Sequence, residues 1–329
     1  MKAHPPIGIG LIGVGRHGSR YVQHLLHDMP EATLAAVCRK RIEEGAGRLP
    51  LSSIPVYGDY RALIADPWVH AIIVVTPPIL CHDICLEAVR AGKPLLIEKP
   101  LAPTAREAQA MVKAAEQEGI LLMTAQTLRF DPAIQKVKDL LSQIGGLRSA
   151  AMTSHIEVKS DIASTSHAFR RRGALLEIGI HLLDVVRFLT GDEVRDVRCR
   201  MNPMPADGPE TRAAVQLTTA TGIECRLDIA RVQAGRIARM DWIGTEGQMS
   251  ADWTQHYITK IGPAGMSETW TVEGRPTILS VLQAFVHAIR TKTPPPVTGM
   301  DGQKAVEIAE ACYRSAELGG QSVDVESGY

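Results

Sequence analysis

Short apolar runs alternate with segments of helical spacing over the first third of the chain. The segments SRYVQHLLHDM, HDICLEAVRAG and AREAQAMVKAAEQEG have helical spacing, and they lie between the apolar runs IGIGLI (7–12), TLAAVC (33–38), AIIVVT (71–76), PLLIEK (94–99) and ILLMTA (120–125). Apolar strands that alternate with helices predict a parallel sheet covered on both faces. We therefore expect a doubly wound α/β domain of the Rossmann type over residues 1–127.

The pattern changes after residue 127. Longer runs such as RSAAMTSHIEV and AAVQLTTATGIECRLDIARV alternate polar and apolar residues and are joined by turn residues. Such alternation is typical of an antiparallel sheet with one solvated or partner-covered face. Two helical segments near the end, PTILSVLQAFVHAIR and DGQKAVEIAEACYRSAELGG, flank the stiff loop TKTPPPVTGM. We expect an α+β domain with a large, mostly antiparallel sheet over 128–329, in which the helix at 301–318 is a candidate to pack back on the first domain.

Composition excludes several classes of protein. The 36 Lys and Arg residues balance the 36 Asp and Glu residues, which is not the basic footprint of a nucleic-acid binder. No apolar run reaches the roughly 18–20 residues of a membrane span, and the start MKAHPPIGIG lacks the apolar core of a signal peptide. We expect a cytoplasmic protein with neither a nucleic-acid nor a membrane partner.

The six cysteines do not predict a metal site. Only Cys81 and Cys85 are close together, with His82 between them, and no second Cys/His pair has zinc-like spacing. Small packing residues on a helix are the favoured interpretation.

The first apolar run ends in a dinucleotide-binding pattern. Gly13-Val-Gly15-Arg16-His17-Gly18 fits G-x-G-x-x-G, follows a strand and opens a helix. Glycines at these positions permit a tight turn and the close approach of backbone N–H groups to a pyrophosphate at the positive end of the helix. A glycine-rich turn without a ligand is the alternative.

The end of the second apolar run favours a phosphorylated cofactor. An NAD-binding domain places an acidic residue there to bind the ribose hydroxyls, whereas this chain has Arg39 and Lys40. A guanidinium can bind a 2′-phosphate through two hydrogen bonds. We expect NADP(H), with NAD(H) possible, and a solvated basic loop as the alternative interpretation.

Two further stretches combine apolar runs with charge. Glu98, Lys99 and Pro100 directly follow an apolar run, where a lysine loses hydration unless a polar function requires it. In GALLEIGIHLLDVVRFLTG (173–191), read as a buried helix from about residue 174, Glu177, His181 and Asp184 fall on one stripe. Flanking carboxylates favour a tuned imidazole over a structural core histidine.

These motifs together carry a family resemblance. GLIGVGRHG, VVTPP, EKPLA, GALLEIGIHLLD and VTGMDGQKAVEIAEACYRSAELGGQSV occur in the order seen in the Gfo/Idh/MocA family, and the resemblance covers nearly the whole chain. Members of this family include glucose–fructose oxidoreductase and inositol dehydrogenases.

The resemblance implies NAD(P)-dependent hydride transfer at a CH–OH group of a small polyhydroxylated substrate: a sugar, a sugar acid or an inositol. Carried onto this chain, it makes His181 the general acid–base and Lys99 the cation that stabilises a developing alkoxide. Thr76 and Pro77 would line the nicotinamide side, and Glu98 would position the loop and the cofactor. The family also implies a homodimer or homotetramer assembled through the second-domain sheet.

The chain departs from the family pattern at two places. Glu177, the third candidate of the catalytic set, stands where the family usually has Asp, and one methylene can move a carboxylate by about 1 Å. The preceding segment is rich in arginine (Arg170, Arg171 and Arg172), which favours either an acidic or phosphorylated substrate or a solvated cationic turn.

Other candidates for substrate contact lie outside these motifs. Gln126 and Arg129 are candidate substrate residues at the domain crossing, where Arg129 alternatively braces the junction. Lys159 and His155 are weaker candidates.

The sequence is also compatible with two alternative functions. A non-catalytic NAD(P)-binding sensor or co-repressor of the same fold would keep the glycine loop but would tolerate loss of Lys99 or His181. A biliverdin-reductase-like enzyme would resemble this chain in the N-terminal domain, but the GIHLLD helix fits it less well.

Overall fold

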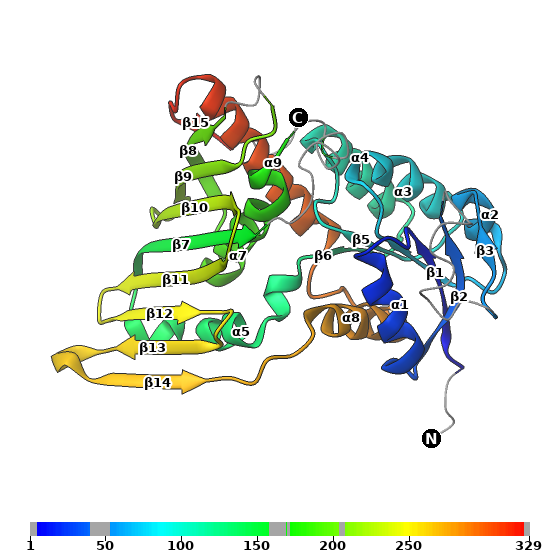
Figure 1. Cartoon of the computed structure of the whole chain (residues 1–329), viewed down its shortest axis with the longest axis horizontal. Helices are drawn as coiled ribbons and strands as arrows, with labels where there is room; N and C mark the ends of the chain where they lie inside the picture. Colours follow the sequence, from blue (N-terminus) through cyan, green and yellow to red (C-terminus); the bar gives the residue numbers. More distant parts are fainter. Residues whose placement is uncertain (1–4, 40–52, 158–168, 170–171, 204–207, 326–329) are drawn as a thin grey trace. The chain divides into compact units, whose positions relative to one another are not determined.

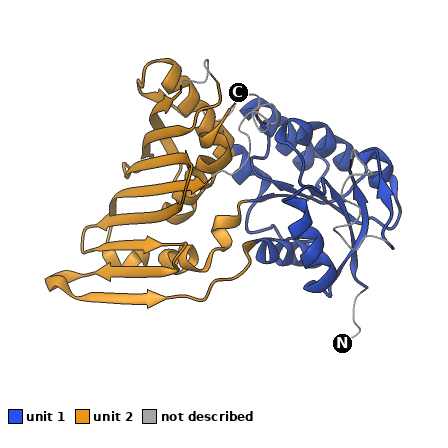
Figure 2. Ribbon diagram, viewed as in Figure 1, with its two compact units in different colours: residues 1–125, 278–303 blue, residues 126–277, 304–329 orange. Residues whose placement is uncertain are grey.

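The computed structural model describes residues 5–39, 53–157, 169, 172–203 and 208–325. The chain forms two compact units, one of residues 1–125 with 278–303 and the other of residues 126–277 with 304–329 (Figure 2). This grouping differs from the predicted domain limits at residues 126–127 and 278–303. Of the helix predicted at 301–318, the part from Lys304 onward is grouped with unit 2.

Unit 1 is built on a six-stranded sheet with the order β3-β2-β1-β4-β5-β6 (Figure 1). All of its ladders are parallel. The strands are β1 (Ile7–Ile12), β2 (Ala32–Cys38), β3 (Val56–Tyr57), β4 (Ala71–Val74), β5 (Leu95–Glu98) and β6 (Leu122–Ala125). The prediction of a doubly wound parallel sheet is confirmed, and the strand order reverses between β1 and β4, where such sheets bind their ligands.

Helices cover both faces of this sheet, α3 and α4 on one side and α1 and α8 on the other (Figure 1). Capping explains where two of them begin: the Thr104 hydroxyl accepts from the Glu107 N–H at the start of α4, and Asp59 caps α2. The bounds are α1 (Gly18–His27), α2 (Tyr60–Ala65), the 3₁₀ turn η2 (Pro78–Leu80), α3 (Cys81–Arg90), α4 (Ala105–Gln117) and α8 (Thr277–Thr291).

Unit 2 is built on a nine-stranded sheet with the order β14-β13-β12-β11-β7-β10-β9-β8-β15. All neighbouring pairs among these strands are antiparallel except β7 and β10, which confirms a mostly antiparallel sheet. The strands are β7 (Leu147–Glu157), β8 (Val194–Asn202), β9 (Arg212–Thr219), β10 (Glu224–Val232), β11 (Arg236–Gly244), β12 (Gln248–Asp252), β13 (Tyr257–Ile261), β14 (Ser267–Thr271) and β15 (Val323–Asp324).

One face of the nine-stranded sheet packs against helical segments and the other is exposed. Along β9 and β11 buried and exposed residues alternate, as expected for a sheet covered on one side. The helical segments are η3 (Thr127–Phe130), α5 (Pro132–Leu140), η4 (Leu141–Ile144), the π-helical turn η5 (Leu175–Gly179), α7 (Ile180–Thr190) and α9 (Gly299–Glu317), whose first residues to Gln303 are grouped with unit 1. The 3₁₀ turn η7 (Pro263–Gly265) connects β13 to β14 and has no buried residue. No helix in the described part of the chain is long and apolar enough to cross a membrane.

Candidate active site

The glycine loop follows β1 and opens α1, as its pattern predicts. Gly13 has a φ of 98°, and a Cβ there would lie 2.3 Å from the Val75 carbonyl oxygen. A Cβ on Gly18 would lie 2.0 Å from the Gly13 carbonyl oxygen. These two glycines are therefore required by the packing of the loop against the end of β4 and against α1.

Gly15 has a different reason to be glycine. A Cβ built on Gly15 would meet no atom within 4 Å, and the residue is exposed, as are Arg16 and His17. Because the protein itself does not need a glycine here, the missing side chain leaves room for a ligand to approach the backbone. Room at the second glycine and a following helix N-terminus fit the pyrophosphate of a dinucleotide.

The predicted 2′-phosphate reader lies at the expected strand end. Arg39 directly follows β2, is half-buried and donates its backbone N–H to the Tyr57 carbonyl at 3.1 Å. Lys40 lies outside the described residues.

Thr76 and Pro77 follow β4, on the other side of the point where the strand order reverses. The Thr76 hydroxyl lies 3.8 Å from the Cys81 sulfur, and burial raises the pKa of that thiol to about 12, so Cys81 stays protonated.

Glu98, the last residue of β5, connects the glycine loop to Lys99. Its Oε1 lies 2.7 Å from His17 Nε2 and accepts a hydrogen bond from the Tyr21 hydroxyl at 2.6 Å, and its Oε2 accepts the backbone N–H of Lys99 at 3.0 Å. The carboxylate of Glu98 thus contacts both a predicted cofactor residue, His17, and the backbone of the predicted catalytic lysine.

The charge of this carboxylate is set by its partners. Burial opposes ionisation of Glu98, which is 7% exposed, but the hydrogen bond and charge of His17, the charge of Lys99 and the hydrogen bond from Tyr21 hold its pKa below the usual value. Glu98 is therefore an anion that orients the backbone at Lys99, as expected for a residue that positions the loop. The Lys99 side chain is half-buried.

In unit 2, the segment that carries Glu177 and His181 begins with a π-helical turn. Residues 175–179 form this turn, the Ile180 N–H donates to the Leu175 carbonyl, and α7 continues from Ile180. The predicted uniform helix is thus widened between Glu177 and His181, so the two residues do not have regular α-helical spacing. Such turns inside helices are frequent at functional sites. Both side chains are half-buried.

A buried glutamate outside the predicted set fixes the start of this segment. Glu210 is fully buried, and its carboxylate accepts the backbone N–H groups of Gly173 at 2.8 Å and Leu175 at 2.9 Å and the Tyr313 hydroxyl at 2.8 Å. Burial raises the pKa of Glu210, and these hydrogen bonds offset only part of the effect. A Cβ on Gly173 would lie 2.1 Å from the Glu210 carbonyl oxygen, so glycine is required there.

Glu177 is paired with an arginine from the sheet. Nε of Arg231, on β10, donates to Oε2 of Glu177 at 2.8 Å, and Nη2 donates to the same oxygen. The Arg231 side chain is 3% exposed and the Glu177 side chain 29%.

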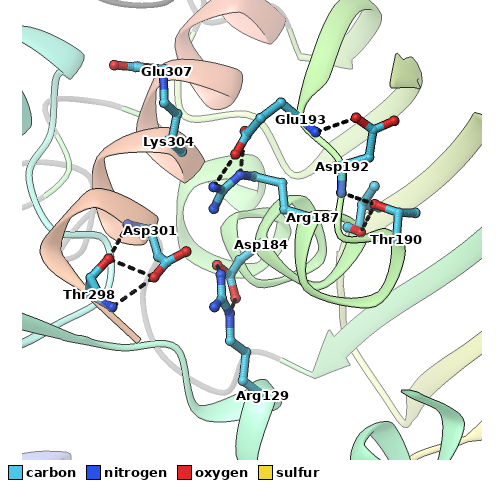
Figure 3. Close-up of polar contacts among 11 residues, drawn as sticks. Arg129, Asp184, Arg187, Thr190, Asp192, Glu193, Thr298, Asp301, Lys304 and Glu307 are labelled. Carbon is cyan, nitrogen blue, oxygen red and sulfur yellow. Dashed lines mark hydrogen bonds and ion pairs between the residues drawn. The ribbon is translucent and has the colours of Figure 1, made fainter. Parts of the chain in front are cut away.

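Asp184 and Arg129 form a separate buried pair. Nε and Nη2 of Arg129 donate to the two carboxylate oxygens of Asp184 at 2.8 and 2.6 Å (Figure 3), and the guanidinium lies over the Phe188 ring. Asp184 is 1% exposed. The guanidinium of Arg129 thus holds η3 to α7 within unit 2. Asp184 therefore serves this pair, whereas the sequence pattern placed it beside His181 as a tuning carboxylate.

The remaining predicted residues have varied environments. Gln126 is 1% exposed, and its amide nitrogen and oxygen have no hydrogen-bond partner among the described residues. Arg172 pairs with Glu310 at 3.3 Å and lies over the Tyr313 ring. His155 pairs with Asp228 at 3.3 Å. Lys159, Arg170 and Arg171 lie outside the described residues.

Within the described ranges, no group of three or more His, Cys, Asp and Glu side chains could hold a metal ion.

Two family models match this chain. The model described as the oxidoreductase family with an NAD-binding Rossmann fold matches residues 7–126, and the model of the GFO/IDH/MocA C-terminal domain matches residues 134–250. Together they span more than half of the chain. The protein belongs to the GFO/IDH/MocA oxidoreductase family. This confirms the resemblance predicted from the motifs.

Relatives in this family match over almost the whole chain. The scyllo-inositol 2-dehydrogenase (NAD(+)) of Bacillus subtilis is 25% identical over 97% of this chain and 97% of its own. The inositol 2-dehydrogenase of Paracoccus denitrificans is 26% identical over 97% of this chain and 96% of its own. The solved structure of scyllo-inositol dehydrogenase from Lactobacillus casei, with bound NAD(H) and scyllo-inositol, shares the fold with a TM-score of 0.82 at 22% identity, over 98% of this chain and 100% of its own.

The sequence motifs of the family did not predict Glu210, Arg231 or Tyr21. Each of them holds a predicted site residue or its backbone, from a position far away in the sequence. Tyr21 had a usable signal, because a tyrosine in an otherwise apolar helix face needs a partner for its hydroxyl. The other two lie at the ends of strands, where a single polar residue gives no periodic signal.

Proposed function

We propose that this GFO/IDH/MocA oxidoreductase is an NADP(H)-dependent dehydrogenase or reductase that acts on a CH–OH group of a sugar, a sugar acid or an inositol. The names of its relatives support this substrate class, since inositol dehydrogenases match it over nearly their full length. The observation that carries the proposal is the carboxylate of Glu98, which joins His17 of the glycine loop to the backbone of Lys99. In this proposal the Glu98 carboxylate couples the glycine loop, which would bind the cofactor, to the position of the candidate catalytic lysine.

The dinucleotide would be held by the backbone of the glycine loop and the N-terminus of α1. Gly15 leaves the room that the pyrophosphate needs, and Arg39 is placed at the strand end from which a 2′-phosphate is read. The bound nicotinamide supplies or accepts the hydride. The protein must then bind the substrate, orient its carbon and move the hydroxyl proton.

Lys99 and His181 are the proposed catalytic residues. The ammonium of Lys99 would stabilise negative charge as it develops on the substrate oxygen. The imidazole of His181 would take the hydroxyl proton in oxidation and return it in reduction. Thr76 and Pro77 would border the nicotinamide.

The first experiment is a fluorescence titration of the purified protein with NADPH and, separately, with NADH. Tighter binding of NADPH supports the proposed cofactor, and Arg39→Asp should then reverse the preference, while Arg90→Asp, at an exposed arginine of α3, should leave it unchanged. If NADH binds more tightly, the NADP(H) part of the proposal is wrong.

A substrate screen then tests the reaction. Absorbance of the reduced cofactor is followed with myo-inositol, scyllo-inositol, aldoses and aldonates in the oxidative direction. Turnover of any of these supports the proposal. Binding of the cofactor without turnover in either direction would favour a non-catalytic sensor of the same fold.

We also infer that the exposed face of the nine-stranded sheet pairs with a second copy of the chain. Large apolar side chains are exposed on this face at Ile237, Ile243, Tyr257 and Ile261, by 45, 51, 47 and 37%. Cross-strand pairing through β12 puts Ile243 and Ile261 in one row. Light scattering should give a dimer or tetramer that Ile243→Lys weakens, and a monomeric wild-type protein would contradict the inference.

A further inference from the structure

The π-helical turn that precedes His181 is held from two adjacent strands. Glu210, just before β9, fixes the backbone of Gly173 and Leu175, and Arg231, near the end of β10, fixes the side chain of Glu177. Ala230 pairs with Arg212 across these two strands, so both contacts come from the same end of the β9–β10 ladder. The turn is therefore anchored by its backbone and by a side chain.

We propose that Arg231 is a positioning residue that acts on His181 through Glu177, and that Glu177 is an anchor of the π-helical turn rather than a proton-transfer group. The inference rests on the proposed function, because it assigns roles around the proposed acid–base residue. It replaces the catalytic role expected for Glu177 with a positioning role.

The geometry of the ion pair carries this assignment. Nε and Nη2 of Arg231 both donate to Oε2 of Glu177, and two donors occupy both lone pairs of that oxygen. The guanidinium is almost completely enclosed, at 3% exposure of the side chain. A buried guanidinium needs a counter-charge, so removal of the Glu177 carboxylate would leave Arg231 buried without this partner.

Side-chain length explains why this chain has Glu at position 177. The turn approaches the sheet closely, because a Cβ on Gly179 would lie 3.3 Å from the Ile229 side chain on β10. Arg231 is two residues beyond Ile229 and on the same side of the strand. An aspartate at 177 would move the carboxylate by about 1 Å relative to the guanidinium. Glu177 and Arg231 are thus matched to each other.

The test compares Glu177→Gln, Arg231→Met and the double variant with the wild-type protein. The matched control is Arg187→Met, which removes another arginine–glutamate pair, with Glu193, from the same helix (Figure 3). Three readouts are used: the urea midpoint, the NMR signals of the His181 imidazole assigned by His181→Gln, and the pH profile of kcat/KM with a polyol found in the screen.

If the inference is correct, each single substitution lowers the urea midpoint and shifts the His181 signals, and the double variant recovers more than half of the loss in midpoint. Turnover of Arg231→Met falls by about 10–100-fold at unchanged KM for the cofactor, and Glu177→Gln keeps the pH profile of the wild-type protein. Arg187→Met changes none of the three readouts by a comparable amount.

Two results would overturn the inference. Loss of one limb of the pH profile in Glu177→Gln, without recovery of turnover in the double variant, would make Glu177 a proton-transfer residue. Unchanged His181 signals in Arg231→Met would make the pair purely structural. If no polyol is turned over by the wild-type protein, the proposed function fails, but the urea midpoints and the His181 signals still decide whether Arg231 acts through Glu177.

Discussion

Glu98 in unit 1 and Glu210 in unit 2 are buried carboxylates with similar hydrogen bonds, but their pKa values are shifted in opposite directions. Each is buried, each accepts two hydrogen bonds at Oε1, one of them from a tyrosine hydroxyl, and each accepts one backbone N–H at Oε2. Glu98 fixes the backbone of the proposed catalytic residue Lys99, and Glu210 fixes the backbone at the start of the segment that carries His181. The pKa of Glu98 is nevertheless lowered, whereas the pKa of Glu210 is raised.

The difference between them lies in one donor. The second donor at Oε1 is the His17 imidazole for Glu98 but the Leu175 backbone N–H for Glu210. An imidazole can carry positive charge, and Lys99 adds more, whereas the Gly173 and Leu175 N–H groups and the Tyr313 hydroxyl that donate to Glu210 are neutral. Hydrogen bonds from neutral donors can therefore pair a buried carboxylate without lowering its pKa below the usual value. Nearby positive charge is what lowers it.

The largest effects are expected at the groups that these carboxylates position. Lys99→Ala and His181→Ala should each reduce turnover by about 10²–10⁴-fold, because each removes charge stabilisation or proton transfer in the transition state. Affinity for NADPH, measured by fluorescence titration, should stay near the wild-type value for His181→Ala. Wild-type turnover in either variant would remove that residue from the proposed mechanism.

The next largest effect is expected for Glu210→Gln. The Gly173 and Leu175 N–H groups face different oxygens of the carboxylate, and both are fixed donors, so neither orientation of a glutamine amide can accept both. One buried N–H would be left without an acceptor, and we expect a loss of about 2–3 kcal/mol in the free energy of unfolding. Urea denaturation measures this loss. Tyr313→Phe, which removes only one donor, is the control, with an expected loss of about 1 kcal/mol.

Glu98→Gln should be tolerated better, and this would sharpen the comparison. Only the Lys99 N–H is a fixed donor here, because the Tyr21 hydroxyl can rotate and the His17 ring can change its tautomer. A glutamine whose oxygen faces Lys99 can donate to both other groups, so the expected loss is about 1 kcal/mol. A loss equal to or greater than that of Glu210→Gln would contradict this account of the donors.

The parallel sheet of unit 1 and the mostly antiparallel sheet of unit 2 could be predicted because both depend on a periodic pattern of buried residues. The predicted runs at 7–12, 33–38 and 120–125 became β1, β2 and β6. The two-residue strand β3 and the six-residue helix α2 were not predicted, since elements this short contain no full period. The π-helical turn was not predicted either, because the apolar pattern of residues 174–190 fits a regular helix equally well.

For the candidate site, motifs identified residues but not their partners. Lys99, Glu98 and the glycines are recognisable because they are adjacent in sequence to strand ends. Glu210 and Arg231 act on residues 35 or more positions away, and their contacts depend on strand register, which a single sequence does not reveal. Arg129 shows the same limit, since its pairing with Asp184 joins residues separated by 55 positions.

The smallest expected effect is a difference in the pH dependence of stability, and it tests the comparison most directly. The pKa of Glu98 is lower in the folded protein than in the unfolded chain, where it is about 4.3. Its contribution to stability is therefore present above that value and is lost as the pH falls through the folded pKa. The pKa of Glu210 is raised, so its contribution is fully present below about 4.3 and is lost as the pH rises through the folded pKa.

Difference curves isolate these two contributions. The stability of the wild-type protein minus that of Glu98→Gln, from urea denaturation at a series of pH values, should increase with pH in the range below about 4.3. The corresponding difference for Glu210→Gln should decrease with pH in the range above it. Subtracting two proteins that differ at one residue cancels the other carboxyl groups. Slopes of the same sign would mean that the charges near Glu98 do not distinguish the two carboxylates. Only opposite slopes follow from one carboxylate that stays ionised and one that resists ionisation.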